Sequence, residues 1–174
     1  MHDNLIILAG GMSSRMKKPS TSNKVSKEDE DEANIKTKSL ISVGNQGRPL
    51  MDYLLYNAQK AGYKNIYIVI NERGGMFKEF YGKNSADNNF NGLNISYAIQ
   101  YTPENRIKPF GTADAVFQAV EQFPELKYQQ FTVCNSDNLY SQKALKKLRE
   151  TTNSNAFISY NRDNLEFSLE KILS

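Results

Sequence analysis

The sequence contains a single cysteine, Cys134, and a single histidine, His2, among its 174 residues. One cysteine cannot form an internal disulfide, which fits a protein of the reducing cytoplasm. Cys134 stands in the apolar run 131–134, where a buried, unreactive thiol is far more common than a nucleophile. His2 stands beside the N-terminus, where we expect a frayed end. A single histidine at such a position argues against histidine-based catalysis and against a histidine-containing metal site.

The sequence also has little excess charge and no long hydrophobic run. Lysine and arginine number 22 and the acidic residues 19, a net charge of +3 that is too small and too dispersed to indicate nucleic-acid binding. No apolar stretch approaches the roughly 20 residues of a membrane-spanning helix, and the opening residues lack the basic region of a signal peptide. We therefore expect a cytoplasmic protein that binds neither nucleic acid nor membrane. An oligomer is compatible with the sequence, which does not fix the oligomeric state.

Strand and helix patterns alternate along a chain whose length is typical of one domain. Apolar runs predict strands over 5–9, 65–70, 94–100, 130–134 and 156–160. Helical patterns cover 50–61, 76–81, 112–123 and 141–150. Strands that are apolar on both faces are typical of a parallel sheet covered by helices. The predicted fold class is α/β: a Rossmann-like three-layer α/β/α arrangement around a mainly parallel, mixed sheet.

The helix predicted over 112–123 has a distinct start and end. Thr112 is a suitable N-cap residue and Pro124 follows the last turn. The spacing of apolar residues predicts a core-facing side formed by Ala113, Val116, Phe117 and Val120.

What the sequence does contain is a small-residue loop directly after its first apolar run. The run 5–9 leads into Gly10 and Gly11, then two serines, then Arg15. Glycine lets the backbone approach an anion closely and point its N–H groups at it. The arginine fork suits phosphate oxygens. The loop therefore predicts a phosphate site.

Three polar residues lie at the end of a predicted strand or in the loop that follows it. Arg15, Gln100 and Asp137 lie at or after strand ends that are far apart in the sequence. In open α/β sheets, ligands bind beyond the carboxyl ends of the strands. We expect these residues to share one crevice.

Further motifs follow the opening loop in order between Leu8 and Asp137. Together they resemble those of the sugar-phosphate nucleotidyltransferases, also called NDP-sugar pyrophosphorylases. The family's opening strand, glycine pair and arginine match 8–16, and its lysine-containing block is similar to 37–50. Its Gly-Thr-Ala segment matches 111–113, and its strand ending in aspartate is similar to 136–137.

The resemblance implies a reaction in which a sugar 1-phosphate attacks the α-phosphate of a nucleoside triphosphate and pyrophosphate leaves. Such a displacement needs positioning and charge neutralisation more than covalent chemistry. By the same resemblance, Arg15 would hold the triphosphate and the departing pyrophosphate, and Lys38 would neutralise the phosphates from the other side. Asp137 would bind Mg²⁺, a hard cation that prefers oxygen ligands.

The resemblance also implies a set of nucleotide-binding positions. Gln100 and Gly111 match family positions that meet the base, which favours a pyrimidine such as uracil or thymine. Asp114 and Asn138 adjoin motif positions, and a capping or turn role suits them equally well. The positions that would bind the nucleotide are Ala9, Gly10, Gly11, Gln100, Gly111 and Thr112.

The sequence departs from the family pattern in three respects. Thr37 stands where the family has proline before the lysine, and the stretch between Arg15 and Lys38 is unusually long, so Lys24 or Lys36 could substitute for Lys38. The later family lysine and the second metal-binding aspartate have no counterpart. We therefore expect residues 1–174 to be a nucleotidyltransferase domain without its C-terminal sugar-phosphate-binding part.

Residues 17–37 have no periodicity and include five consecutive acidic residues, Glu28-Asp-Glu-Asp-Glu32. They predict a flexible, charged, solvated loop. A lid over a phosphate ligand is the alternative, and only the position of the segment supports it.

Two other functions remain open at this stage. A non-catalytic nucleotide-sensing domain of the same fold would explain the missing second aspartate, and a cytidylyltransferase acting on a phospho-alcohol can share the opening motif. A dinucleotide-binding oxidoreductase is disfavoured because 9–16 lacks Gly-x-Gly-x-x-Gly. A P-loop NTPase is disfavoured because its Gly-x4-Gly-Lys-Ser/Thr string is absent.

Overall fold

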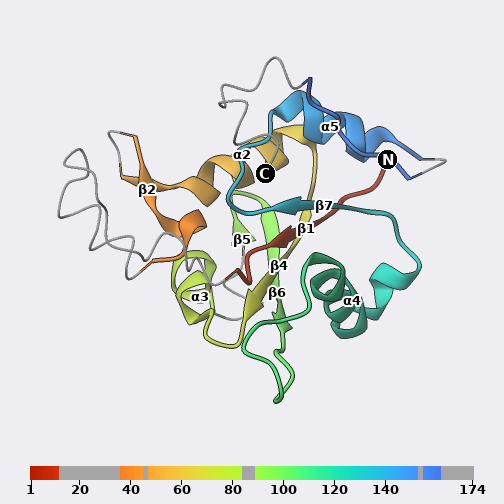
Figure 1. Ribbon diagram of the computed structural model, residues 1–174. Helices are drawn as coiled ribbons and strands as arrows, with labels where there is room; N and C mark the ends of the chain where they lie inside the picture. Colours follow the sequence, from red (N-terminus) through yellow and green to blue (C-terminus); the bar gives the residue numbers. More distant parts are fainter. Residues whose placement is uncertain (12–35, 45–46, 84–88, 153–154, 162–174) are drawn as a thin grey trace.

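The computed structural model describes residues 1–11, 36–44, 47–83, 89–152 and 155–161 (Figure 1). Its strands are β1 (Asn4–Leu8), β2 (Ser42–Val43), β3 (Arg48–Pro49), β4 (Asn65–Asn71), β5 (Asn89–Phe90), β6 (Leu93–Gln100) and β7 (Phe131–Asn135). Its α-helices are α2 (Leu50–Ala61), α3 (Gly75–Tyr81), α4 (Thr112–Gln122) and α5 (Gln142–Glu150), with short 3-10 helices η1 (Lys38–Leu40) and η2 (Pro124–Lys127).

The main sheet has five strands in the order β5-β6-β4-β1-β7. Neighbours from β6 to β7 are parallel, and only the two-residue β5 is antiparallel. The chain adds β4 and β6 on one side of β1 and then crosses to place β7 on the other side. Such a reversal opens a crevice at the carboxyl ends of the strands around it. The mainly parallel, mixed α/β sheet predicted from the sequence is confirmed.

Two hydrophobic cores, one on each face, cover this sheet. On one face α2, α3 and α5 pack on strand residues such as Leu5 and Ile68. On the other face α4 and η2 pack on Ile6 and Val69. Figure 1 shows α2 and α5 on one side of the sheet and α4 on the other. The alternation of strand side chains between the two cores produces the predicted three layers.

The strand predicted over 156–160 does not form. Residues 155–161 have no regular secondary structure, and the Phe157 side chain is 87% exposed. A strand requires a ladder of backbone hydrogen bonds to a neighbour, and the segment's apolar, β-branched and aromatic composition supplies only a preference. Among the described strands, β7 is paired with β1 alone.

Helix α4 begins as predicted, but its capping and its buried side differ from the prediction. Gly111 is the N-cap, and Thr112 is the first helical residue. Ala115 and Ala119 are buried, whereas Ala113 and Phe117 are exposed, so the predicted core-facing side was wrong for these two.

Two glutamines of α4 explain why the buried side of this helix differs from the predicted one. The Gln122 amide accepts from the Ile99 N–H at 2.9 Å and donates to the Ile99 carbonyl at 2.8 Å. Gln118 makes the same pair of bonds with the backbone of Tyr101, at 2.8 and 3.2 Å. The helix therefore turns these polar residues toward β6, since each amide satisfies two backbone groups at once.

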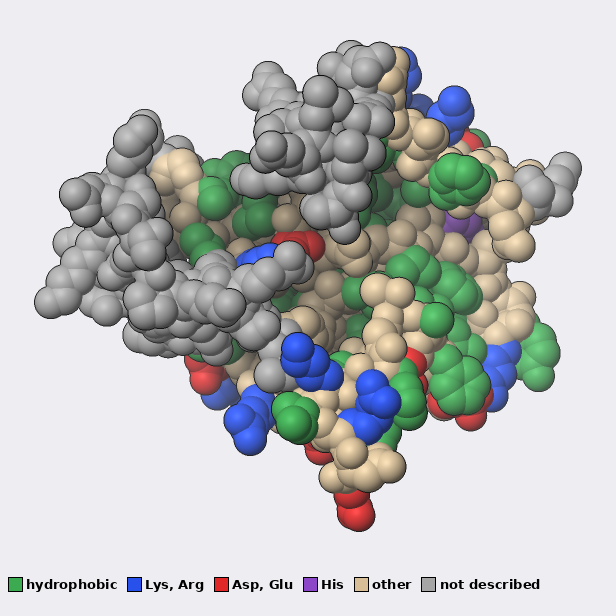
Figure 2. Space-filling model, viewed as in Figure 1, with side chains coloured by type: hydrophobic (Ala, Val, Ile, Leu, Met, Phe, Trp, Pro, Cys, Tyr) green, Lys and Arg blue, Asp and Glu red, His purple; other side chains and the backbone are tan. Residues whose placement is uncertain are grey.

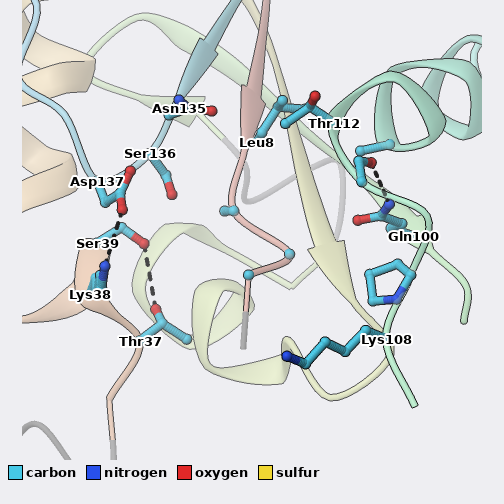
Figure 3. A pocket seen from close by; sticks show the side chains of 16 residues that line it. Leu8, Thr37, Lys38, Ser39, Gln100, Lys108, Thr112, Asn135, Ser136 and Asp137 are labelled. Carbon is cyan, nitrogen blue, oxygen red and sulfur yellow. Dashed lines mark hydrogen bonds and ion pairs between the residues drawn. The ribbon is translucent and has the colours of Figure 1, made fainter. Parts of the chain in front are cut away.

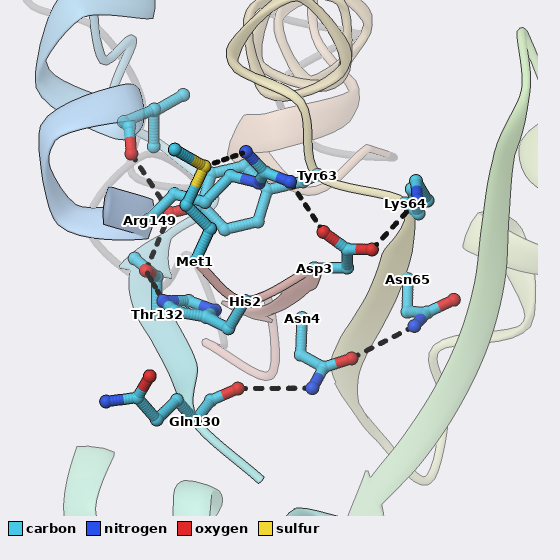
Figure 4. A network of polar contacts seen from close by, with 11 residues as sticks. Met1, His2, Asp3, Asn4, Tyr63, Lys64, Asn65, Gln130, Thr132 and Arg149 are labelled. Atoms are coloured by element: carbon cyan, nitrogen blue, oxygen red, sulfur yellow. Dashed lines mark hydrogen bonds and ion pairs between the residues drawn. The ribbon is translucent and has the colours of Figure 1, made fainter. Parts of the chain in front are cut away.

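The N-terminus is held by polar contacts, contrary to the predicted frayed end (Figure 4). Asp3 forms ion pairs with Arg149 of α5 at 2.6 Å and with Lys64 at 3.0 Å. The His2 ring lies edge-on to Tyr63, with centroids 5.8 Å apart, and its Nε2 is 3.4 Å from the Thr132 hydroxyl. These contacts join the first residues to three other parts of the fold.

Cys134 lies in β7 as an unpaired, buried thiol. Burial raises its pKa to about 12, so the thiol stays protonated at neutral pH and is a poor nucleophile. The prediction of an unreactive core cysteine is consistent with this environment.

Candidate active site

A pocket of about 470 Å³ opens at the carboxyl ends of β1, β6 and β7. The space-filling view in Figure 2 shows a hollow near the centre of this face, with basic side chains along its lower rim. The pocket contains every predicted site residue that the structure describes: Ala9, Gly10, Gly11, Lys38, Gln100, Gly111, Thr112 and Asp137. Arg15 lies outside the described residues, as does Lys24. The predicted loop 17–37 also lies outside them, except for Lys36 and Thr37.

The first wall of the pocket is the chain that leaves β1. The Ala9 N–H donates to the Val69 carbonyl at 2.8 Å, so β1 stays paired with β4 for one residue beyond Leu8. The Asn71 side chain then donates to the Gly10 carbonyl at 3.3 Å. Within the described part of the chain, no group accepts a hydrogen bond from the N–H of Gly10 or Gly11. These two amides line the pocket and can bind an anion.

The second wall carries both a cation and a carboxylate. Lys38 begins η1, and Asp137 follows β7, which the Ser136 N–H ties to the Leu8 carbonyl at 3.1 Å. The Lys38 Nζ is 3.6 Å from the Asp137 Oδ2, and the two side chains are 39% and 42% exposed (Figure 3). An ion pair this long and this open is weak, so a charged ligand can compete for both groups.

Lys36 and Lys38 lie differently with respect to the pocket. Lys36 and Lys38 were both compatible with the phosphate-binding role. Lys38 lines the pocket, whereas Lys36 approaches the Ser42 hydroxyl at 3.4 Å and lies over the Phe80 ring. Of these two lysines, Lys38 is the one that lines the pocket, and its phosphate-binding role stays a prediction.

The third wall is the loop between β6 and α4. Gln100 is 5% exposed, and its amide Nε2 donates to the Gly111 carbonyl at 3.0 Å and to Asp114 Oδ2 at 2.9 Å. Gly111 has φ +128°, a conformation that side chains rarely tolerate, so glycine is required at this sharp entry into the helix. The Gly10 backbone lies close to the Gln100 side chain, since a Cβ at residue 10 would be 3.1 Å from Gln100 Oε1.

Lys108 lines the same loop wall and was missed by sequence reasoning. Arg106 holds its backbone, since the Arg106 Nε donates to the Lys108 carbonyl at 3.1 Å and the guanidinium lies over the Phe110 ring at 4.4 Å. Among the described acidic side chains, none is within ion-pair distance of Lys108. Its position in the sequence, between Gln100 and the Gly-Thr-Ala motif, was the signal that could have pointed to Lys108.

The described residues offer little for a metal ion apart from Asp137. In the part of the chain that the structure describes, no group of three or more His, Cys, Asp or Glu could enclose a cation. Mg²⁺ is commonly held by one or two carboxylates together with substrate phosphates, rather than by an all-protein cage. A lone carboxylate beside a phosphate pocket fits that mode of binding.

Comparison with known proteins identifies the family. The Nucleotidyl transferase family matches residues 4–166. The chain belongs to this family. The resemblance drawn from the sequence motifs is thereby confirmed for the family, while the roles of the individual site residues stay predictions. No curated protein matches the chain.

Solved structures support the same fold for this nucleotidyltransferase-family chain. A UDP-glucose pyrophosphorylase in complex with UDP-glucose aligns with a TM-score of 0.59 at 15% identity, over 86% of this chain and 52% of that one. The UTP-bound enzyme from Acinetobacter baumannii aligns with a TM-score of 0.58 at 15% identity, over 85% and 51%. The chain spans about half the length of these structures. No helix of the described residues is long and apolar enough to cross a membrane.

Proposed function

We propose that this chain is the nucleotide-binding part of an enzyme that transfers a nucleoside monophosphate from a nucleoside triphosphate to a sugar 1-phosphate. The observation that carries the proposal is the pocket itself, which places two glycine amides, Lys38 and Asp137 at one edge of the sheet. Family membership supports the reaction class. The UDP-glucose and UTP named for two structural neighbours support the ligand class.

The chemistry is a displacement at phosphorus. An oxygen of the sugar 1-phosphate forms a bond to the α-phosphorus as the bond to the bridging oxygen of pyrophosphate breaks, and the electron pair leaves with pyrophosphate. The Gly10 and Gly11 amides would hold phosphate oxygens, and Lys38 would neutralise their charge. Charge neutralisation and positioning are the main demands of such a transfer. Arg15 would contribute a second cation by the family resemblance.

Asp137 would hold Mg²⁺, which when bound neutralises phosphate charge further. The Lys38–Asp137 ion pair holds this carboxylate at the pocket surface, beside the lysine. Binding of a metal–nucleotide complex would exchange the pair for two stronger contacts: lysine to phosphate and carboxylate to metal.

We assign to this chain the nucleotide side of the reaction, because it spans about half the length of the structures it matches. A non-catalytic nucleotide-binding domain is the second candidate. One observation favours it: among the described residues that line the pocket, Asp137 is the single carboxylate.

Calorimetric titration with nucleoside triphosphates, with and without Mg²⁺, tests the proposal together with an assay of pyrophosphate release. Wild-type protein is expected to bind a triphosphate more tightly with Mg²⁺, and Asp137→Asn to lose roughly 10- to 100-fold in that Mg²⁺-dependent affinity. Asn138→Ala, at the exposed neighbouring residue, is the matched control. Absence of triphosphate binding under both conditions would refute the proposal. Binding without turnover, retained in Asp137→Asn, would favour the non-catalytic candidate.

A further inference from the structure

Lys108 brings a second lysine to the pocket, on a different wall from Lys38. Lys38 belongs to η1, whereas Lys108 belongs to the loop between β6 and α4. Figure 3 shows the Lys108 side chain extended into the pocket from this loop, across from Lys38. The chain that leaves β1, with the amides of Gly10 and Gly11, lines the pocket as well. An anion bound to these amides would therefore meet a cation on either side.

The charge of Lys108 is left available to a ligand. Lys38 and Asp137 are paired at 3.6 Å, so these two lining charges offset each other. Among the carboxylates that the structure describes, none forms an ion pair with Lys108. Lys108 alone therefore gives the described lining a net positive charge. A net positive lining attracts anions such as a polyphosphate.

The backbone that carries Lys108 is held by its neighbours in the loop. The Arg106 Nε donates to the Lys108 carbonyl at 3.1 Å, and the Arg106 N–H donates to the Pro103 carbonyl at 2.9 Å. The Arg106 guanidinium also lies over the Phe110 ring. Pro109 follows Lys108 directly and favours an extended backbone at the lysine. With the backbone held in this way, mainly the lysine side chain has to be ordered when a ligand binds, which lowers the entropic cost.

We propose that Lys108 binds the phosphates of the nucleotide, so that the polyphosphate lies between Lys108 and Lys38. A lysine ammonium has three hydrogen-bond donors and no acceptor, which suits phosphate oxygens. The inference rests on the proposed function, because it assumes a nucleotide ligand. It adds a contact at the phosphates and concerns neither the base nor the sugar.

The first test is calorimetric titration with ATP, GTP, CTP and UTP in the presence of Mg²⁺. Lys108→Ala should weaken every affinity that wild-type protein shows by the same factor, about fivefold, because the contact is to phosphate rather than to the base. Lys108→Arg keeps the charge and should recover most of the affinity. Lys143→Ala is the matched control, since it removes an equal charge from an exposed position on α5 outside the pocket lining.

Three outcomes of this titration would overturn the inference. They are an unchanged affinity in Lys108→Ala, an equal loss in Lys143→Ala, and a loss confined to one of several bound nucleotides. In each case wild-type protein still binds a triphosphate, so the proposed function stands. If wild-type protein binds none of the four triphosphates, the proposed function itself fails.

A second test separates direct contact from long-range attraction. Reductive methylation with a ¹³C label keeps the charge of each lysine and gives it an NMR signal. The Lys108 signal is identified by its absence from Lys108→Arg. Saturation with the tightest-binding of the four triphosphates and Mg²⁺ should shift this signal and leave that of Lys143 in place. A Lys108 signal that does not move at saturation would overturn the contact.

Discussion

The two ends of the sheet use charged residues in opposite ways. At the amino ends of the strands, Asp3 and Arg149 meet at 2.6 Å with side chains only 33% and 16% exposed. At the carboxyl ends, Asp137 and Lys38 are 3.6 Å apart and 42% and 39% exposed. The first pair is short, shielded and bonded to further groups of the fold, whereas the second is long and open to a pocket. We infer that the contacts at the amino end contribute to stability, whereas those at the carboxyl end leave two charged groups accessible at the pocket.

The largest effect is expected from breaking the shielded pair. Arg149→Ala leaves Asp3 without its closest partner and removes the guanidinium that covers Gly62. We expect the free energy of unfolding to fall by about 2 kcal/mol, below the value for a fully buried pair because Asp3 is partly exposed. Urea denaturation measures the loss.

Lys64→Ala is the matched control for that experiment. It removes the other ion pair of Asp3, but the Lys64 side chain is 67% exposed. Its cost should stay below about 1 kcal/mol. Equal losses in the two variants would show that shielding does not distinguish the contacts at this end of the sheet.

A smaller effect, on binding rather than on stability, is expected at the other end. Lys38→Ala should weaken nucleoside triphosphate binding roughly tenfold, or about 1.4 kcal/mol, because one charge-assisted contact to phosphate is lost. The free energy of unfolding should change by less than about 0.5 kcal/mol, since the Lys38–Asp137 pair is exposed.

Lys36→Ala serves as the comparison for Lys38→Ala, since Lys36 lies two residues away but outside the pocket lining. It should bind the triphosphate as the wild type does. If Lys36→Ala lost as much triphosphate affinity as Lys38→Ala, a position in the pocket lining would not explain the contribution of Lys38.

The smallest effect is a dependence of stability on pH, between pH 8 and pH 3, to which two groups at the amino end contribute. Burial, with the nearby Arg149 and N-terminal charges, lowers the pKa of His2 below 6.5, so the folded protein holds it neutral. The unfolded chain binds a proton at His2 as pH falls through about 6.5, a higher pH than the folded protein requires. The stability contributed by neutral His2 is therefore complete above pH 6.5 and is lost as pH falls through the folded-state pKa.

Asp3 adds to this dependence at more acidic pH. Hydrogen bonds from Arg149 and Lys64 lower its pKa below 3.8, so its contribution is lost as pH falls below that value. Urea denaturation between pH 8 and pH 3 should show both losses. His2→Gln should remove the first and keep the second, and an unchanged profile in that variant would contradict the assignment to His2.

Sequence reasoning succeeded where one local pattern was sufficient. The apolar runs predicted the strands of the parallel sheet, and the motif residues Gly10, Lys38 and Asp137 predicted one pocket that the fold does assemble. Sequence reasoning failed where contacts with residues far away in the sequence determine the structure. The side of α4 that faces the sheet depends on bonds between its glutamines and β6, and residues 156–160 have strand-like composition without a strand partner.

At the candidate site, Asp114 and Lys108 are likewise residues whose contacts could not be predicted from the sequence. The sequence left Asp114 as a capping or turn residue, because its contact with Gln100 exists only once the loop between β6 and α4 has folded. Lys108 belongs to no motif, and the bonds from Arg106 that hold its backbone are equally dependent on the folded loop.

The backbone hydrogen bonds made by Gln118 and Gln122 of α4 have a consequence for solubility. An exposed sheet edge is a template on which a strand from another molecule can add, a common route to aggregation. Beyond the two-residue β5, the outer backbone groups of Ile99 and Tyr101 are already occupied by side-chain amides of Gln122 and Gln118. At Ile99 and Tyr101 helix α4 therefore takes the place of an edge strand, and a strand from another molecule could pair there only by displacing the two glutamine amides.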